Sequence, residues 1–179
     1  MNMRNSKLME RNALKQVAGF MCAAARTAPK AKGVDNIAAI IMDTEKEKNM
    51  LIKQMLIAAK KENKPGFERD ALNLKQSPVI VLIGTKTAAI GLTCGFCGFK
   101  DCAAMEAAAA VCSYNPMDLG IAVGSAAGIA ADFHIDNRIM YSAGKIAVEM
   151  NLFKDKKITI ALAIPLSASG KNIFFDRTK

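Results

Sequence analysis

The sequence predicts one domain of the α+β class, in which helices pack around a small sheet. Apolar residues at helical spacing alternate along the chain with a few short, continuously apolar runs. This alternation is typical of a sandwich of helices and buried strands, α+β or α/β. The length of 179 residues suits one domain with its own core. Apolar residues make up 51% of the chain, which excludes wholesale disorder. We therefore expect residues 1–179 to form a single domain.

The first two predicted elements are a helix and a short strand. Residues 5–26 predict an amphipathic helix, and Pro29 ends it because residues before a proline avoid the helical conformation. The apolar face of this helix is formed by Leu14, Val17, Ala18 and Met21. Residues 37–42 form a partly β-branched apolar run, which predicts a buried strand.

Two helices are expected after this strand. Thr44 and Glu47 have the spacing of a capping box, which predicts that a helix begins here and continues to about Lys61. The residues expected on its buried face are Met50, Leu51, Met55 and Ala58. Residues 63–66 break this helix, and residues 68–75 form a second, shorter one.

The second half of the chain continues the alternation of helices and strands. Two apolar strands and two helices are predicted, at residues 78–83, 158–164, 117–133 and 137–151. Gly84 is expected to end the first of these strands and Pro165 the second, because both residue types interrupt strands. A polar tail follows at residues 167–179.

Three glycines recur at steps of four in the predicted helix 117–133. Gly120, Gly124 and Gly128 therefore lie on one helix face. Each glycine costs about 1 kcal/mol relative to alanine in a helix, so a close approach of another backbone or a flat cofactor is the expected gain. Packing against a second helix in the core is the favoured interpretation.

The formal charge of +9 is concentrated outside the middle of the chain. Residues 1–70 carry a net +6 and residues 121–179 a net +3, whereas residues 71–120 are neutral. A basic surface attracts nucleic acid, phosphorylated ligands or acidic proteins, although a solvated lysine-rich surface is the simplest interpretation. Nucleic acid is disfavoured, because no block of lysine and arginine is interleaved with aromatic residues.

We expect a cytoplasmic protein with no membrane association. Residues 1–10 are polar and charged and lack the apolar segment of a signal peptide. The longest apolar stretch, residues 119–131, is too short and too rich in glycine and alanine to span a bilayer. Five cysteines are too few for a disulfide scaffold, and an odd number leaves one unpaired.

Four of the five cysteines lie close together with the spacing C-x2-C-x4-C-x9-C. They are Cys94, Cys97, Cys102 and Cys112, in a cysteine-rich segment at residues 91–113. Thiolates are soft ligands that favour zinc, copper(I) or iron–sulfur clusters. Gly95 and Gly98 follow the first two cysteines and give the backbone freedom to wrap a cluster.

An iron–sulfur cluster is favoured over zinc at these cysteines. A structural zinc site usually combines two C-x2-C pairs, and this chain has only one. A chance grouping of free cysteines is the third alternative. The fifth cysteine, Cys22, lies among alanines of the first helix and is expected to be a packing residue.

Two resemblances involve the cysteines. Residues 91–103 resemble the C-G-x-C-G-x-x-x-C core of a small 4Fe–4S domain, in which the fourth cysteine lies further downstream than Cys112 does here. Nearly the whole chain resembles the DUF2148 family, whose members are described as containing a ferredoxin domain. Besides the cysteine motif, this resemblance rests on residues 24–33, 118–125, 136–141 and 165–172. It implies a 4Fe–4S cluster on the four cysteines.

A fainter resemblance is to the nitroreductase-like flavoprotein fold. Residues 25–29, Ala-Arg-Thr-Ala-Pro, are similar to the stretch that precedes a flavin-contacting loop in that family. Residues 117–133 resemble its long central helix at the dimer interface. The resemblance implies a three-layer sandwich and a homodimer with FMN between the subunits, here with the cysteine-rich segment as an inserted metal-binding loop. The candidate FMN contacts are Arg26, Lys30, Asn36 and Lys171. The chain lacks that family's paired N-terminal arginines and its Asn-Gln-Pro-Trp stretch.

Together these features predict a redox protein with one 4Fe–4S cluster, a candidate FMN site and a redox partner protein. An oxidoreductase activity fits, but no catalytic residue is assigned, since the only histidine, His134, lies in a predicted loop with no evident role. The alternative is a zinc-stabilised, non-catalytic binding module with an anionic partner. A cluster that acts as a sensor is a third possibility.

Overall fold

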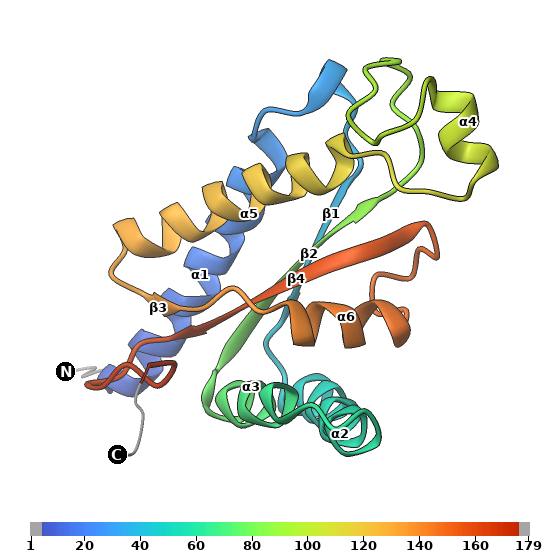
Figure 1. Cartoon of the computed structure of the whole chain (residues 1–179). Helices are drawn as coiled ribbons and strands as arrows, with labels where there is room; N and C mark the ends of the chain where they lie inside the picture. Colours follow the sequence, from blue (N-terminus) through green and yellow to red (C-terminus); the bar gives the residue numbers. More distant parts are fainter. Residues whose placement is uncertain (1–4, 176–179) are drawn as a thin grey trace.

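A four-stranded antiparallel sheet lies between two layers of helices in the computed structural model, which describes residues 5–175 (Figure 1). Across the sheet, the strands are β1 (Ile37–Met42), β2 (Val79–Lys86), β4 (Ile158–Ser167) and β3 (Asp136–Asn137). The helices are α1 (Ser6–Thr27), the short 3-10 helix η1 (Ala31–Gly33), α2 (Glu45–Lys61), α3 (Pro65–Gln76), α4 (Cys102–Ala107), α5 (Tyr114–Asp132) and α6 (Tyr141–Glu149). The predicted α+β sandwich is confirmed.

The central strand β2 supplies both layers of the core. It pairs antiparallel with both of its neighbours, with Thr85 opposite Ile37 of β1 and Val79 opposite Leu166 of β4. Residues 79–85 are all buried, because helices cover both faces of the sheet. Alternate side chains of the strand therefore enter opposite core layers.

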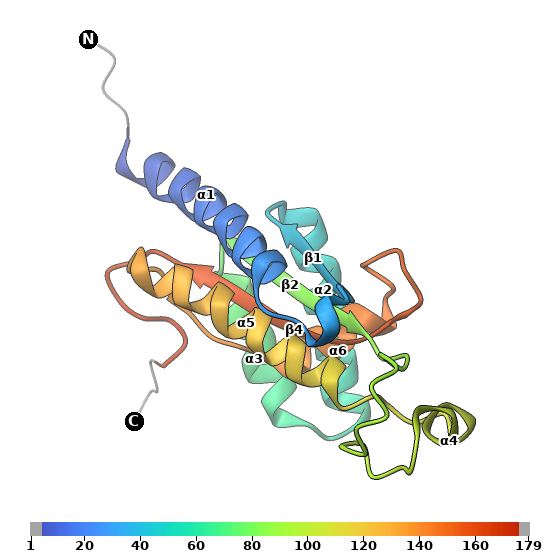
Figure 2. The same ribbon diagram turned by 90° about the horizontal axis from the view of Figure 1, so that it is seen from above.

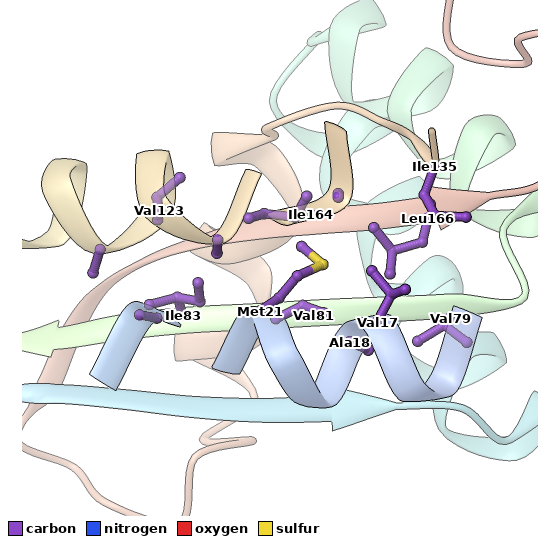
Figure 3. Close-up of a cluster of buried hydrophobic side chains, with 14 of the residues drawn as sticks. Val17, Ala18, Met21, Val79, Val81, Ile83, Val123, Ile135, Ile164 and Leu166 are labelled. Carbon is purple, nitrogen blue, oxygen red and sulfur yellow. The ribbon is translucent and has the colours of Figure 1, made fainter. Parts of the chain in front are cut away.

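Helices α1 and α5 cover one face of the sheet. Figure 3 shows the first core layer, in which side chains of both helices meet side chains of β2 and β4. Its labelled members are Val17, Ala18, Met21, Val79, Val81, Ile83, Val123, Ile135, Ile164 and Leu166. The predicted apolar face of α1 lies in this layer, since its four residues are at most 3% exposed.

Helices α2, α3 and α6 cover the other face of the sheet. Phe67, Met140 and Ile146 contribute to this second core layer, as does Phe174 of the C-terminal segment. Helix α6 lies so close to β4 that a β-carbon added to Gly144 would come within 1.9 Å of the carbonyl oxygen of Ala161. The predicted role of Met50 is wrong, since this side chain is 50% exposed.

The structure corrects the predicted ends of two strands. β2 continues past Gly84, where an added β-carbon would meet the Ile158 side chain at 2.6 Å, so close packing explains this glycine. β4 continues past Pro165 to Ser167. On the outer side of β4, the N–H of Ala163 donates to the carbonyl of Met140. The backbone nitrogen of Pro165 points to the same side of β4. Because β3 pairs only with residues 166 and 167, the N–H that proline lacks would have had no partner in the sheet.

Two further expectations change around α5 and α6. Residues 136–137 form the edge strand β3, so α6 begins later than predicted. Gly120, Gly124 and Gly128 are exposed, and none would bring a β-carbon within 4 Å of another residue of the described chain. The expected packing of these glycines against a helix within the chain is therefore wrong. His134 lies exposed in the turn after α5. None of the helices within residues 5–175 is long and apolar enough to cross a membrane.

Candidate functional site

The cysteine-rich segment forms a separate lobe at one end of the sandwich, before α5 (Figure 2). All four clustered cysteines line one small pocket in this lobe. Cys94 is exposed, Cys97 and Cys102 are half-buried, and Cys112 is only 7% exposed. The cysteines that the sequence singled out are thus brought together in space.

Turns and a short helix bring the cysteines together. Thr93, Gly95 and Gly98 have positive φ angles of 49°, 73° and 83°, so the chain reverses direction around Cys94 and Cys97. The N–H of Gly98 donates to the carbonyl of Gly95 over 2.9 Å. Asp101 then caps α4 by accepting from the N–H of Ala104 at 2.7 Å. This cap places Cys102 in the first turn of α4.

The surroundings of the pocket suit a thiolate and limit its contact with water. The backbone N–H of Thr93 donates to Sγ of Cys102 over 3.4 Å, a bond that stabilises a negatively charged sulfur. Tyr114 lines the pocket, and its ring stacks on the ring of Phe96 with centroids 5.6 Å apart. Met105 beneath is 1% exposed.

The pocket is nearly filled by its own side chains. Its free volume is about 10 Å³, roughly the space of one water molecule. Within residues 5–175, no three histidine, cysteine or acidic side chains have the geometry of metal ligands. Four thiols are a suitable set of donors for a soft metal centre. Because the pocket is too small to hold one, binding would require the loop at residues 91–101 to open. That loop contains no helix or strand to resist such a movement.

Cys22 stands apart from this pocket and packs against the first core layer from α1. Burial raises the pKa of its thiol, while the positive charge of Arg26 acts in the opposite direction. Its expected role as a packing residue is confirmed.

The last turn of α1 and the loop from α1 to β1 hold three of the four candidate FMN contacts. Arg26 donates to the carboxylate of Asp35 and, over 2.7 Å, to the carbonyl of Ile37. The Lys30 side chain is 6% exposed and caps the end of α1, with 2.9 Å from its Nζ to the carbonyl oxygen of Ala28. Burial acts to raise the pKa of Asp35, but bonds from Arg26 and the Ile37 N–H and the charges of Arg26 and Lys30 hold it below its usual range. Both cations thus already stabilise the loop.

Two buried polar residues of α5 bind this loop, and one of them also binds the segment that leads into the cysteine-rich lobe. Asn36 donates to the side-chain oxygen of Asn115 over 2.8 Å, and Asn115 donates to the carbonyl of Ala88 over 2.7 Å. One turn further along α5, the Asp118 carboxylate accepts from the backbone N–H of Ala31 at 3.1 and 3.2 Å. Asn115 and Asp118 were not predicted as site residues, although polar residues three apart at the start of an apolar helix indicate an inward-facing pair.

The same loop also packs directly against the lobe. Ala31 contacts the small apolar cluster formed by Ile90, Met105 and Cys112. Lys171, the fourth candidate FMN contact, lies elsewhere. It follows β4 beyond the Leu166–Val79 pair, whereas Asn36 lies at the opposite end of β2. One copy of the chain therefore does not bring Lys171 to the other three residues.

A protein from Archaeoglobus fulgidus is 35% identical to this chain over 182 residues, which cover 97% of this chain and 96% of its own length. The family model described as "Uncharacterized protein containing a ferredoxin domain (DUF2148)" matches residues 108–177. The chain belongs to the DUF2148 family. Within this DUF2148 protein the matched region contains Cys112, whereas Cys94, Cys97 and Cys102 lie before it.

Solved structures of flavoproteins and of a nitroreductase-like protein share the fold of this DUF2148 chain. A BluB-like flavoprotein from Clostridium difficile superimposes with a TM-score of 0.60 at 16% identity, covering 92% of this chain and 84% of its own. A nitroreductase-like protein from Streptococcus mutans gives a TM-score of 0.61 at 12% identity, covering 88% and 80%. A protein described as an oxidoreductase containing FMN gives 0.56 at 14%, covering 87% and 68%. The DUF2148 chain thus has a nitroreductase-like fold.

Proposed function

We propose that this protein transfers electrons by means of one 4Fe–4S cluster held by Cys94, Cys97, Cys102 and Cys112. The observation that carries the proposal is the single pocket lined by these four cysteines. The family description, which names a ferredoxin domain, supports it. When bound, such a cluster supplies one-electron chemistry.

The surrounding residues have defined tasks in this proposal. The N–H of Thr93 stabilises negative charge on the Cys102 sulfur, 3.4 Å away. The stacked rings of Phe96 and Tyr114 limit water at the pocket, which protects a cluster from hydrolysis and oxidant. The loop at residues 91–101 opens to admit the metal centre and closes over it.

FMN is the second cofactor in this proposal, bound at the loop between α1 and β1. The fold is shared with flavoproteins, one of them described as containing FMN. Ala31 of this loop packs against the apolar side chains around Cys112, so a flavin bound here would lie next to the cysteine pocket. Adjacent one- and two-electron centres could exchange electrons singly. In this proposal, Arg26 and Lys30 shape the loop as well as contacting the flavin.

A homodimer completes the proposed flavin site. The solvent-facing side of α5 carries the three glycines, and Met117 and Ile121 beside them are 46% and 45% exposed. A second copy could approach closely along this small-residue stripe. Because Lys171 lies at the opposite end of the sheet from Asn36, a flavin that contacts both residues needs two copies of the chain.

The proposal is tested by a visible spectrum of protein isolated without oxygen. The expected result is broad absorption that bleaches on one-electron reduction, together with quenching of FMN fluorescence on titration with the protein. A Tyr114→Ala variant should show faster loss of the absorption in air than a Tyr141→Ala control, because Tyr141 lies on α6 away from the pocket.

Two other results would decide against parts of this proposal. A colourless protein that contains one zinc per chain and no sulfide would favour the zinc-stabilised binding module. Absorption from a cluster without FMN binding would retain the electron-transfer function and remove the flavin.

A further inference from the structure

Helices α2 and α3 lie on the side of the sheet opposite α1 and α5 (Figure 1). Side chains of both helices line a groove. Its volume is about 410 Å³. Ile52 and Leu56 are half-buried and lie in the floor, together with the buried Ala71. Ile57 and Leu72 stand on its sides and are 48% and 52% exposed. The groove is thus an apolar channel open to solvent.

Lysines surround this channel. Lys53 and Lys60 of α2 and Lys75 of α3 line it, and no carboxylate does. Within the described residues, none of these three lysines makes an ion pair or hydrogen bond. The two acidic residues of α3 lie elsewhere: Asp70 is buried and pairs with Arg69, and Glu68 lines an adjoining depression. Three unpaired cations beside apolar side chains leave a concentrated positive potential that an anionic partner would neutralise.

We propose that this groove binds an acidic amphipathic helix of a partner protein. The lining residues of α2 run from Asn49 to Lys60, a length of about 16 Å, or about three helical turns. Apolar residues of a partner helix at positions i, i+4 and i+7 match a channel of this length. Lysines on both α2 and α3 place positive charge along both flanks of such a helix, where its Asp and Glu side chains would lie.

Neither a second copy of the chain nor a lipid surface suits the groove as well. A symmetric contact between two copies would bring the same three lysines of each copy together, and the like charges would repel. A lipid surface is wide and flat, whereas three of the five apolar lining residues here form the floor of a channel between two helices. The proposal is independent of the cysteine pocket, so the metal-free full-length chain suffices to test it.

The test measures the fluorescence anisotropy of a labelled helical peptide of about 14 residues, about four turns, with Leu at i, i+4 and i+7 and Glu on both flanks. We expect saturable binding that weakens as salt is added. The triple variant K53E/K60E/K75E should lower the affinity at least about tenfold. The control K46E/K156E/K157E makes the same change in charge at exposed lysines outside the groove and should change the affinity less than about twofold.

A second variant tests the apolar part of the site. Leu72→Ser leaves the lysines in place at a position that is already exposed, and it should weaken binding several-fold without lowering the melting temperature. The proposal is overturned if the acidic peptide does not saturate, if both triple variants lose affinity equally, or if Leu72→Ser has no effect. Binding of anionic vesicles in preference to the peptide would overturn it, as would a dimer that K53E/K60E/K75E dissociates.

Discussion

The side-chain amide of Asn36 donates a hydrogen bond of 2.8 Å to the side chain of Asn115, 79 residues further along the chain. The side-chain amide of Asn115 in turn donates to the backbone carbonyl of Ala88 over 2.7 Å. Because Asn115 is completely buried, water cannot replace either bond. The first turn of α5 therefore joins the loop before β1 to the segment that leads into the cysteine pocket.

Asn115→Ala should loosen both of the segments that Asn115 holds. The change leaves the Asn36 amide and the Ala88 carbonyl without their partner, and each such group costs about 1–3 kcal/mol. We expect a lower free energy of unfolding and faster amide hydrogen exchange at both residues 28–36 and residues 87–93. Ser125→Ala, on the same helix, is the control and should change neither. Faster exchange in only one of the two segments would refute the coupling.

Gly144→Ala should strongly destabilise the fold. The added β-carbon would lie 1.9 Å from the Ala161 carbonyl oxygen and 2.7 Å from Cα of Leu162, so α6 would have to move away from β4. A loss of about 3 kcal/mol or more is expected, measured by urea denaturation. Gly19→Ala in α1, where no atom lies within 4 Å of the added group, should instead raise stability by about 1 kcal/mol. Equal stability of the two variants would contradict the close contact between α6 and β4.

Gly124→Arg should separate the proposed dimer while leaving each chain folded. A β-carbon added at Gly124 would have no atom of the described chain within 4 Å, whereas the long arginine side chain would obstruct a second copy packed along the glycine stripe. Size-exclusion chromatography with light scattering should show two chains for the native protein and one for the variant. Gly66→Arg in α3, also without near neighbours, is the matched control. A native protein that is already monomeric would exclude the dimer.

Cys22 should react with iodoacetamide much more slowly than Cys94 in the native, metal-free protein. Cys94 is exposed, whereas Cys22 is half-buried and burial raises the pKa of its thiol. A raised pKa means less thiolate at pH 8, and the thiolate is the reactive form. Peptide mass spectrometry should show at least about tenfold slower labelling of Cys22, with the difference removed in guanidinium chloride. Similar native rates would show that Cys22 is accessible.

The positions of the main strands were predictable because they depend on short-range pattern. Residues 78–83 are continuously apolar, residues 158–164 are apolar except for Thr159, and helices cover both faces of the sheet. The ends of these strands were not predictable. Whether Pro165 breaks β4 depends on the gap in the neighbouring strand β3, and whether Gly84 ends β2 depends on the Ile158 side chain. Neither relationship is visible in the local sequence.

In the candidate site, too, short-range features were predictable from the sequence and long-range contacts were not. The spacing of the four cysteines predicts that they gather, because nearby cysteines need only short turns to meet. The bond between Asn36 and Asn115 joins residues far apart in sequence, so only the folded chain reveals it. The glycines of α5 were correctly placed on one face, but the sequence does not say whether the surface facing them belongs to the same chain.

The most direct test of the proposed cluster is the iron and acid-labile sulfide content of protein isolated without oxygen, measured for the native chain and for each cysteine-to-serine variant. The account predicts about four iron and four sulfide per chain for the native protein and for Cys22→Ser. It predicts loss of most of both for the variants at Cys94, Cys97, Cys102 and Cys112. Native protein without sulfide would contradict the account, and so would a Cys112→Ser variant that keeps its iron while Cys22→Ser loses it.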